Sequence, residues 1–192
     1  MNTPFTRRRV PAALAAVALA VSLGALAPQA SAEDGGAPFG PGCASVPKQG
    51  TGSLADLADD PVATAASKNP ALSTLVTAVQ KAGLVDTLNN AKGITVFAPT
   101  NDAFAKIPKA DLDKVLADKA TLTKILTYHV VDEPVKKADL ADGSFKTLQG
   151  GTLTTAGSGD SYKVNDTASV VCGDVRTANA TVHVIDTVLM PR

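Results

Sequence analysis

Thr95-Val96-Phe97-Ala98-Pro99-Thr100-Asn101-Asp102-Ala103-Phe104 is the stretch of sequence that says most about the fold. Residues 94–98 are β-branched, aromatic or small, and Gly93 and Pro99 bound them, which predicts a short buried strand. Thr100 follows as the N-cap of a helix that opens at Asn101 and ends at Pro108. We therefore expect a buried strand to run directly into a capped helix near the middle of the chain.

The segment before this strand, residues 54–92, predicts helices. Asn69-Pro70 is a helix start, because Asn caps well and Pro suits the first helical position. An apolar face at helical spacing follows, made of Leu72, Leu75, Val76 and Val79. Gly83 is placed to end this helix. Asp60-Pro61 predicts a shorter helix before it, and residues 84–88 predict one or two further turns.

The pattern changes from helix to strand near Tyr128. Apolar positions at 112–116 and 122–126 predict two more helices, with Asp118 as a cap between them. The predicted strands are 128–131, 145–148, 152–155, 161–164, 169–172 and 181–189. Gly150-Gly151 and Asn165-Asp166 indicate turns, and residues 157–160 indicate a flexible loop. Helices followed by a run of strands predict an α+β fold.

Composition and charge exclude several classes of function. The chain has 192 residues, with 18 Lys and Arg against 18 Asp and Glu, and such a balance disfavours a nucleic-acid binder. Hydrophobic residues make up 45%, which is enough for one domain with a core. Aromatic residues make up 4%, Trp is absent, and two Cys and two His are too few for a four-ligand zinc site.

Residues 1–32 have the parts of a secretory signal peptide. Arg7, Arg8 and Arg9 form a basic start, an apolar run follows over 10–27, and Ala30-Ser31-Ala32 is a cleavage site. The competing transmembrane anchor is disfavoured, because the run is short for a span and the cleavage motif follows it directly. The export route, general or twin-arginine, stays open. Cleavage after Ala32 leaves 160 residues with a net charge of about −3, a secreted chain without membrane insertion.

The two cysteines, Cys43 and Cys172, are expected to form a disulfide in an oxidising compartment. Cys43 lies in a Gly- and Pro-rich arm, residues 33–53, that precedes the domain at 54–192. The alternative for Cys43, lipidation, is disfavoured because Gly40-Pro41-Gly42 is not an apolar lipobox. The disulfide would tie the arm to the body of the domain.

Three blocks together resemble the fasciclin-like domain: residues 95–104, Leu126-Thr127-Tyr128-His129-Val130-Val131, and residues 180–189. The resemblance covers about residues 55–191 and is strongest to small secreted immunogenic fasciclin-type antigens of mycobacteria. Those also carry a Gly-Pro-Gly-Cys arm and a Val-Val-Cys-Gly segment, here at 40–43 and 170–173. The resemblance implies a wedge-shaped β-sandwich flanked by helices from the N-terminal half. It also implies adhesion or extracellular protein contact without catalysis.

In animal members of the family, a Tyr-His pair at this place is linked to adhesion, and the resemblance implies the same role for Tyr128 and His129. The structural interpretation is stronger, because a His where a helix meets an apolar strand is usually buried and hydrogen-bonded. Asp102 is its expected partner. His183, between Val182 and Val184, is expected to be a strand residue, and whether it meets His129 in a metal or haem site cannot be read from sequence.

The residues predict a secreted domain, and the resemblance implies that it is a monomeric, non-enzymatic protein-interaction or adhesion module whose partner is a cell-surface or extracellular matrix protein. No catalytic motif, cofactor or metal site is expected. The alternative is an extracellular carrier of haem or lipid, which requires an apolar pocket of several hundred Å³ with converging polar groups. The acceptor sequons at Asn165 and Asn179 are expected to be idle, with Asn179-Ala180 serving as a turn.

Overall fold

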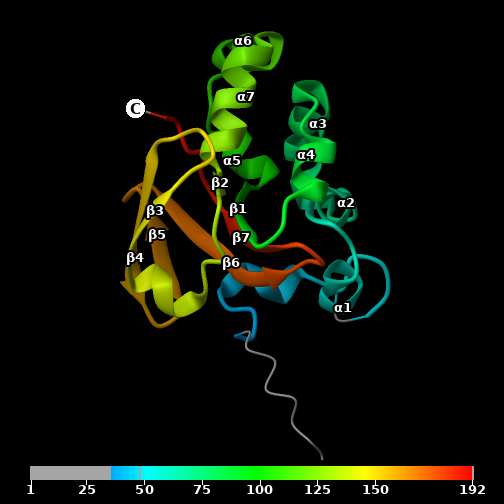
Figure 1. Ribbon diagram of the computed structural model, residues 1–192, viewed down its shortest axis with the longest axis vertical. Helices are drawn as coiled ribbons and strands as arrows, with labels where there is room; N and C mark the ends of the chain where they lie inside the picture. The colour runs from blue at the N-terminus through cyan, green and yellow to red at the C-terminus, as the bar shows by residue number, and fades with distance from the viewer. Residues whose placement is uncertain (1–35, 48, 192) are drawn as a thin grey trace, which may run out of the picture. The chain divides into compact units, whose positions relative to one another are not determined.

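A computed structural model describes residues 36–47 and 49–191, which belong to one compact unit. The predicted signal peptide and its cleavage site lie outside the described residues. The chain order is helices first and strands second, as Figure 1 shows in the passage from cyan and green to yellow and red. The α+β expectation is confirmed.

Seven α-helices occur in the described part of the chain, and all but the last two precede or directly follow the first strand. They are α1 Leu54–Ala58, α2 Val62–Ser67, α3 Ser73–Ala82, α4 Val85–Asn90, α5 Asn101–Ala105, α6 Lys109–Ala117 and α7 Lys119–Tyr128. Short 3-10 helices, η1 to η3, cover Pro41–Ser45, Pro70–Leu72 and Lys137–Ala141.

The strands form one mixed sheet that nearly closes on itself. They are β1 Ile94–Pro99, β2 Val130–Val131, β3 Asp142–Lys146, β4 Thr152–Ser158, β5 Ser161–Val164, β6 Ala168–Arg176 and β7 Ala180–Ile185. Their order is β2-β1-β7-β6-β5-β4-β3, with β1 and β7 parallel and the other pairs antiparallel. A bridge between Val131 and Thr147 joins the two ends. The predicted β-sandwich is therefore a nearly closed, barrel-like wedge.

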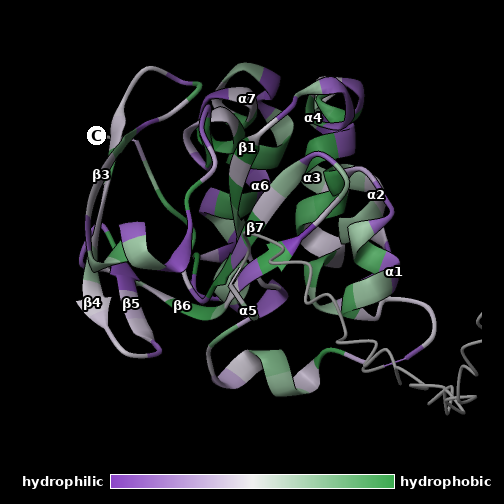
Figure 2. Cartoon of the chain, turned by 60° about the horizontal axis from the view of Figure 1, so that its bottom comes forward, coloured by the Kyte–Doolittle hydropathy of each residue, from purple (hydrophilic) through white to green (hydrophobic). Residues whose placement is uncertain are grey.

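Strand β1 separates two apolar cores, because both of its faces are buried. Ile94, Val96 and Ala98 face a core shared with the helices. Phe97 faces a second core inside the barrel, with Tyr128, Leu153 and others. In Figure 2 the apolar segments accordingly gather along β1, β7 and the helices beside them. A parallel strand buried on both faces explains the uninterrupted apolar run in the sequence.

The predicted helix boundaries are confirmed at three caps. Asn69 Oδ1 accepts from Ala71 N at 3.0 Å, Thr100 Oγ1 from Ala103 N at 3.2 Å, and Asp118 Oδ1 from Ala120 N at 2.9 Å. Gly83 ends α3 with φ 73°, the left-handed conformation that favours glycine. Local side-chain chemistry therefore sets these helix ends.

Three predictions about the strand region are wrong in detail. Residues 157–160 are not a loop, since β4 and β5 continue to Ser158 and Ser161 around a two-residue turn. Gly157 permits this, because a Cβ there would lie 2.2 Å from Ser161 O. The strand predicted from Tyr128 starts at Val130, because α7 runs through Tyr128. The last strand ends at Ile185 rather than Leu189.

The described part of the arm packs on the sheet instead of extending away from it. Phe39 is buried and forms a β-bridge with Gly173, with backbone bonds of 3.1 Å and 2.8 Å. Its ring contacts Tyr162, with the centroids 5.2 Å apart. Cys43 is bonded to Cys172. The arm thus contributes a side chain to the barrel core as well as a disulfide.

Candidate functional site

His129 lies at the end of α7 and is 2% exposed. Its Nδ1 lies 2.8 Å from Ile125 O, and its Nε2 lies 2.9 Å from Leu189 N. The carbonyl requires an N–H and the amide requires a lone pair, so the ring is the neutral Nδ1–H tautomer. Burial lowers the pKa of His129 to about 4, and the bond to Ile125 opposes this effect.

The predicted pairing of His129 with Asp102 is wrong. Both ring nitrogens are already bonded to backbone groups, and Asp102 is an exposed residue in the first turn of α5. The backbone partners come from the same helix and from the segment after β7. A carboxylate is not needed, because a neutral imidazole is satisfied by one acceptor and one donor.

Tyr128 is also internal, at 5% exposure. Its hydroxyl donates to Thr152 O at 3.0 Å and accepts from Asn165 Nδ2 at 3.1 Å. These bonds join α7 to β4 and to the tight turn at Asn165, whose φ is 50°. Direct contact of the Tyr128-His129 pair with a partner would require exposed side chains, so the pair acts in this geometry as internal support.

His183 lies on β7 with 0% exposure. Its Nδ1 accepts from Asp174 N at 3.1 Å, and its Nε2 donates to Val135 O at 3.0 Å. Burial lowers the pKa of His183 to about 4. Its ring packs between Phe39 and Phe97, at centroid distances of 6.3 Å and 5.4 Å. His183 is therefore a strand residue, as expected, and its ring lies in the core with both nitrogens bonded to backbone groups.

The two histidines do not form a metal or haem site. Each uses both nitrogens on backbone groups, and a ligand to iron would have to displace one of those bonds. Across residues 36–47 and 49–191, no group of three or more His, Cys, Asp or Glu side chains is placed to hold a metal ion. The same residues contain no helix long and apolar enough to cross a bilayer.

Asn179 forms long-range hydrogen bonds in addition to the turn that the sequence predicts. Its Nδ2 donates to Leu88 O and Ala91 O at 2.7 Å each, and its Oδ1 accepts from Val62 N at 2.8 Å. It thereby connects the end of α4 and the start of α2 to the sheet. Sequence reasoning missed this role because its partners lie about 90 and 117 positions away in the chain.

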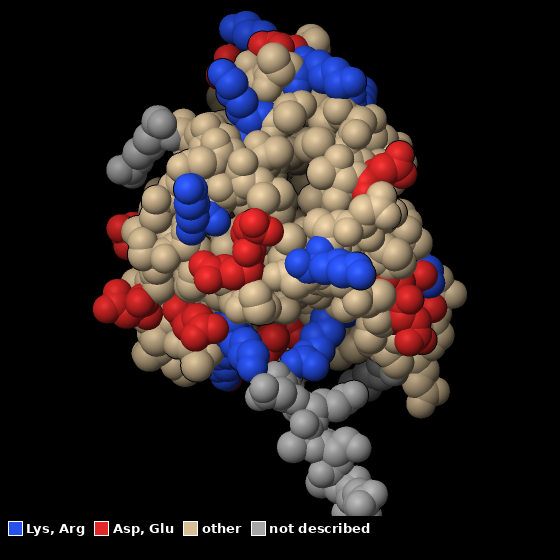
Figure 3. Space-filling model, viewed as in Figure 1, with Lys and Arg blue, Asp and Glu red and all other residues tan. Residues whose placement is uncertain are grey.

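An apolar cavity of about 220 Å³ lies between the helices and the sheet. Side chains of α2, α3 and α4 line one side, and β1, β7 and the end of α7 line the other. Figure 3 shows the surface hollowed between α7 and the α3–α4 pair, with uncharged atoms around the hollow. The buried residues that line the cavity belong mainly to the helix-facing core, and Phe97 is the one member of the barrel core among them.

Fold and site together define an α+β scaffold domain in which the candidate polar side chains serve the packing of a nearly closed barrel. The Fasciclin domain model matches residues 70–191. The chain therefore belongs to the fasciclin family.

Named relatives support this assignment. The chain is 51% identical over 161 residues to the cell surface glycolipoprotein MPB83 of Mycobacterium bovis, which covers 80% of this chain and 72% of that protein. It is 47% identical over 198 residues to the immunogenic protein MPB70 of the same species, covering 99% and 97%. Protein sll1483 of Synechocystis is 43% identical over 128 residues, covering 66% and 71%.

The fold matches a solved FAS1 domain pair from the insect cell adhesion molecule fasciclin I. The TM-score is 0.58 at 21% identity, and the match covers 71% of this chain and 52% of that one. This chain thus spans about half the length of that structure, and the likeness concerns the fold alone.

Proposed function

We propose that this chain is an extracellular protein-interaction module without catalytic activity, of the adhesion type. The observation that carries the proposal is the internal use of Tyr128, His129 and His183, whose polar atoms bond to groups inside the domain. Because these side chains form their hydrogen bonds inside the domain, the functional contacts are made by other residues, on the outer surface. Membership of the fasciclin family and similarity to a cell surface glycolipoprotein point the same way.

The mechanism is presentation of exposed loops and helix faces by a rigid barrel. Loops held on a well-packed scaffold are common binding surfaces. Tyr128 and His129 support such surfaces from inside, since they join α7 to β4 and to the segment after β7. The partner is a cell-surface or extracellular matrix protein, bound by a monomer, and nucleic acid is not a partner.

Export precedes this function in the proposal. Residues 1–32 direct secretion and are removed after Ala32, so that the disulfide forms in an oxidising compartment. Intact-mass measurement of protein from the culture medium tests this. A mass corresponding to residues 33–192 with both cysteines oxidised is expected. Retention of residues 1–32, or recovery in the cell fraction alone, contradicts it.

Cell attachment tests the interaction itself. Residues 33–192, oxidised and immobilised, are expected to retain cells in a saturable manner, and the same protein in solution is expected to compete. Purified matrix proteins on a biosensor identify the partner class. If neither cells nor matrix proteins bind at micromolar concentrations, the proposed adhesion role is wrong. Sedimentation velocity on the same sample checks the monomer.

A further inference from the structure

The surface contacts proposed above do not involve the cavity between the helices and the sheet. It extends from Val46 and Leu57, past α2 and α3, to Thr127 and Leu148. Its two long walls belong to the helical layer and to β1 with β7. An elongated space between two layers differs from the isolated small voids that occur in most protein interiors.

The side chains around the cavity are small, which explains why it stays open. Ala63, Ala65, Ala66 and Ala98 contribute to its walls, and most of the others are Val or Leu. The barrel core contains the rings of Phe39, Phe97, Tyr128, Phe145 and Tyr162, whereas Phe104 is the one buried aromatic residue described in the helix-facing core. Of the Phe and Tyr residues that the structure describes, Phe97 alone lines the cavity, and it belongs to the barrel core.

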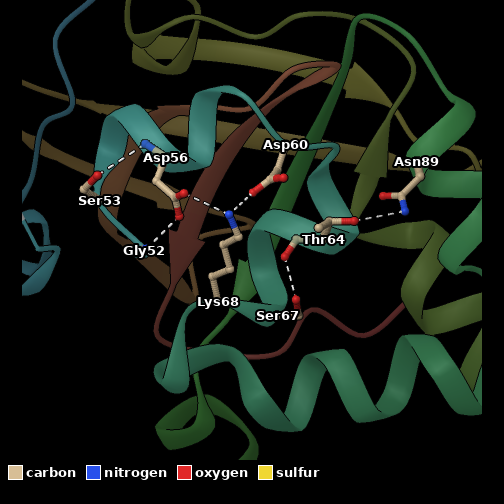
Figure 4. Close-up of polar contacts among 8 residues, drawn as sticks. All are labelled: Gly52, Ser53, Asp56, Asp60, Thr64, Ser67, Lys68 and Asn89. Carbon is tan, nitrogen blue, oxygen red and sulfur yellow. Dashed lines mark hydrogen bonds and ion pairs between the residues drawn. The ribbon is translucent and has the colours of Figure 1, made fainter. Parts of the chain in front are cut away.

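The lining carries no charge among the described residues. Its polar members are neutral, namely Thr64, Ser67, Asn69, Gln80, Thr87, Thr127, His129 and Thr177. His129 is already bonded through both nitrogens. Figure 4 shows the ionised groups beside α2, where Lys68 is paired with Asp56 at 2.9 Å and with Asp60. A charged ligand group inside the cavity would find no counter-ion, which is costly.

Size and shape restrict the occupant further. A cavity of about 150 Å³ lined by Leu, Ile and Phe side chains stays dry and binds benzene. This one, at about 220 Å³, is larger, but it is too small for even one turn of a helix, which fills about 420 Å³ at a diameter of about 10 Å and a pitch of about 5.4 Å. We propose that the cavity binds one uncharged aliphatic chain, lying lengthwise between α2–α4 and the sheet. This site is independent of the surface contacts proposed above.

Titration with 1-decanol, followed by NMR of the ¹⁵N-labelled oxidised protein, tests the site. Amide shifts are expected to saturate at one ligand per chain and to concentrate in α3, β1 and the end of α7. Amides of β4 and β5, on the far side of the barrel core, are expected to stay unchanged. A lysophosphatidylcholine with a decanoyl chain forms a second arm. If decanol binds and the lysophosphatidylcholine does not, the natural ligand is a free aliphatic molecule. If both bind, the ligand is the tail of a lipid.

Measuring the affinity of a series of primary alcohols of increasing chain length distinguishes binding in the cavity from nonspecific partition. Each added methylene is expected to tighten binding about fourfold, from about 0.8 kcal/mol of burial. The gain should stop once the chain fills the cavity. Decanoate is expected to bind at least tenfold more weakly than decanol, since no lining cation is available.

Val76→Trp is the blocking variant, because Val76 is half-buried on α3 and lines the cavity. The chain has no Trp, so the new indole also reports its own burial through its emission maximum. At least a tenfold loss of decanol affinity is expected. Val115→Trp on α6 is the matched control, half-buried but outside the lining, and should bind as the wild type does.

Three results overturn the proposal. They are shifts that do not saturate or that spread evenly over the domain, affinity that keeps rising with chain length, and decanoate binding as tightly as decanol. The NMR titration uses the unaltered chain, so it decides even if Val76→Trp does not fold. Cell attachment by the wild type, with or without decanol, is scored separately and bears only on the interaction function.

Discussion

His129 satisfies two backbone groups from different parts of the chain, the Ile125 carbonyl of α7 and the Leu189 amide after β7. His129→Ala leaves both buried groups unpaired and opens a void. We expect the free energy of unfolding to fall by about 2–4 kcal/mol. Urea denaturation followed by far-UV circular dichroism measures this change.

Asp102→Ala is the matched comparison, since the sequence points to Asp102 as the partner of His129. It removes an exposed carboxylate in the first turn of a short helix and should cost about 0.3–1 kcal/mol. Equal losses in the two variants would contradict the structural assignment. Unchanged stability of His129→Ala together with lost cell attachment would instead show that His129 contacts the partner.

Both buried histidines make stability depend on pH. Their pKa values are about 4 in the folded chain against 6.5 in the unfolded chain, so the unfolded chain binds more protons between these values. Stability is therefore complete above about pH 6.5 and is lost as the pH falls toward 4. At pH 5 the loss should reach about 2 kcal/mol per histidine.

Urea midpoints between pH 4.5 and 7.5 measure this slope, and the His183→Asn variant should lose part of it. Burial raises the pKa of Asp174, which works in the opposite direction, because that group gains stability as the pH falls. A flat profile over this range in the wild type would show that the two rings are not buried as neutral species.

The burial of His129 is predictable from its sequence, but its partners are not. An apolar neighbourhood at a helix end is visible in the sequence around His129. The Leu189 amide is 60 positions away and reaches the ring only because β7 pairs with β1. Asp102 lies 27 positions from His129 in the chain, and most side-chain hydrogen bonds in proteins go to backbone groups or water rather than to another side chain.

Asn179 shows the same long-range dependence among the secondary-structure elements. One amide connects α2, α4 and the start of β7, with bonds of 2.7–2.8 Å. Asn179→Ala should lower the free energy of unfolding by about 2–3 kcal/mol, because several helix-end groups lose a buried partner. Hydrogen exchange should show faster opening of α4 than of β1.

Asn90→Ala is the control for this prediction. Asn90 is exposed, and its Nδ2 bonds only to Asp86 O of its own helix, at 2.8 Å. The change should cost less than about 0.5 kcal/mol. If the two asparagine variants exchange alike throughout α4, the connecting role of Asn179 is wrong.

Helix ends could be predicted from the sequence and sheet closure could not. Thr100, Asp118 and Gly83 act through bonds or backbone angles within a few residues, so their sequence signals are sufficient. The barrel depends on the parallel pairing of β1 with β7 and on the bridge from Val131 to Thr147. β2 is two residues long, and a strand so short has no periodicity to detect.

For the domain as a whole, the two cores differ in the size of the side chains that build them. The barrel core combines five aromatic rings with aliphatic residues from the arm and strands. The helix-facing core has smaller side chains and contains the cavity. The sequence shows that aromatic residues are few, but only the fold reveals that they gather on one side of β1. The cavity therefore arises from the way the helices pack on the sheet and could not be predicted from the sequence.

The disulfide between Cys43 and Cys172 links the arm to β6 across 129 positions of the chain. In the chain-entropy model a loop of this length stabilises the folded state by about 4–5 kcal/mol, because the link restricts the unfolded chain. Cys43→Ala/Cys172→Ala should therefore unfold at a clearly lower urea concentration than the oxidised wild type. Dithiothreitol should bring the wild type to the midpoint of the variant and leave the variant unchanged. The bridge of Phe39 to Gly173 involves neither cysteine side chain and is expected to persist in the variant, so the difference measures the covalent link. Equal midpoints for oxidised wild type and variant would mean that packing of the arm alone holds it on the sheet.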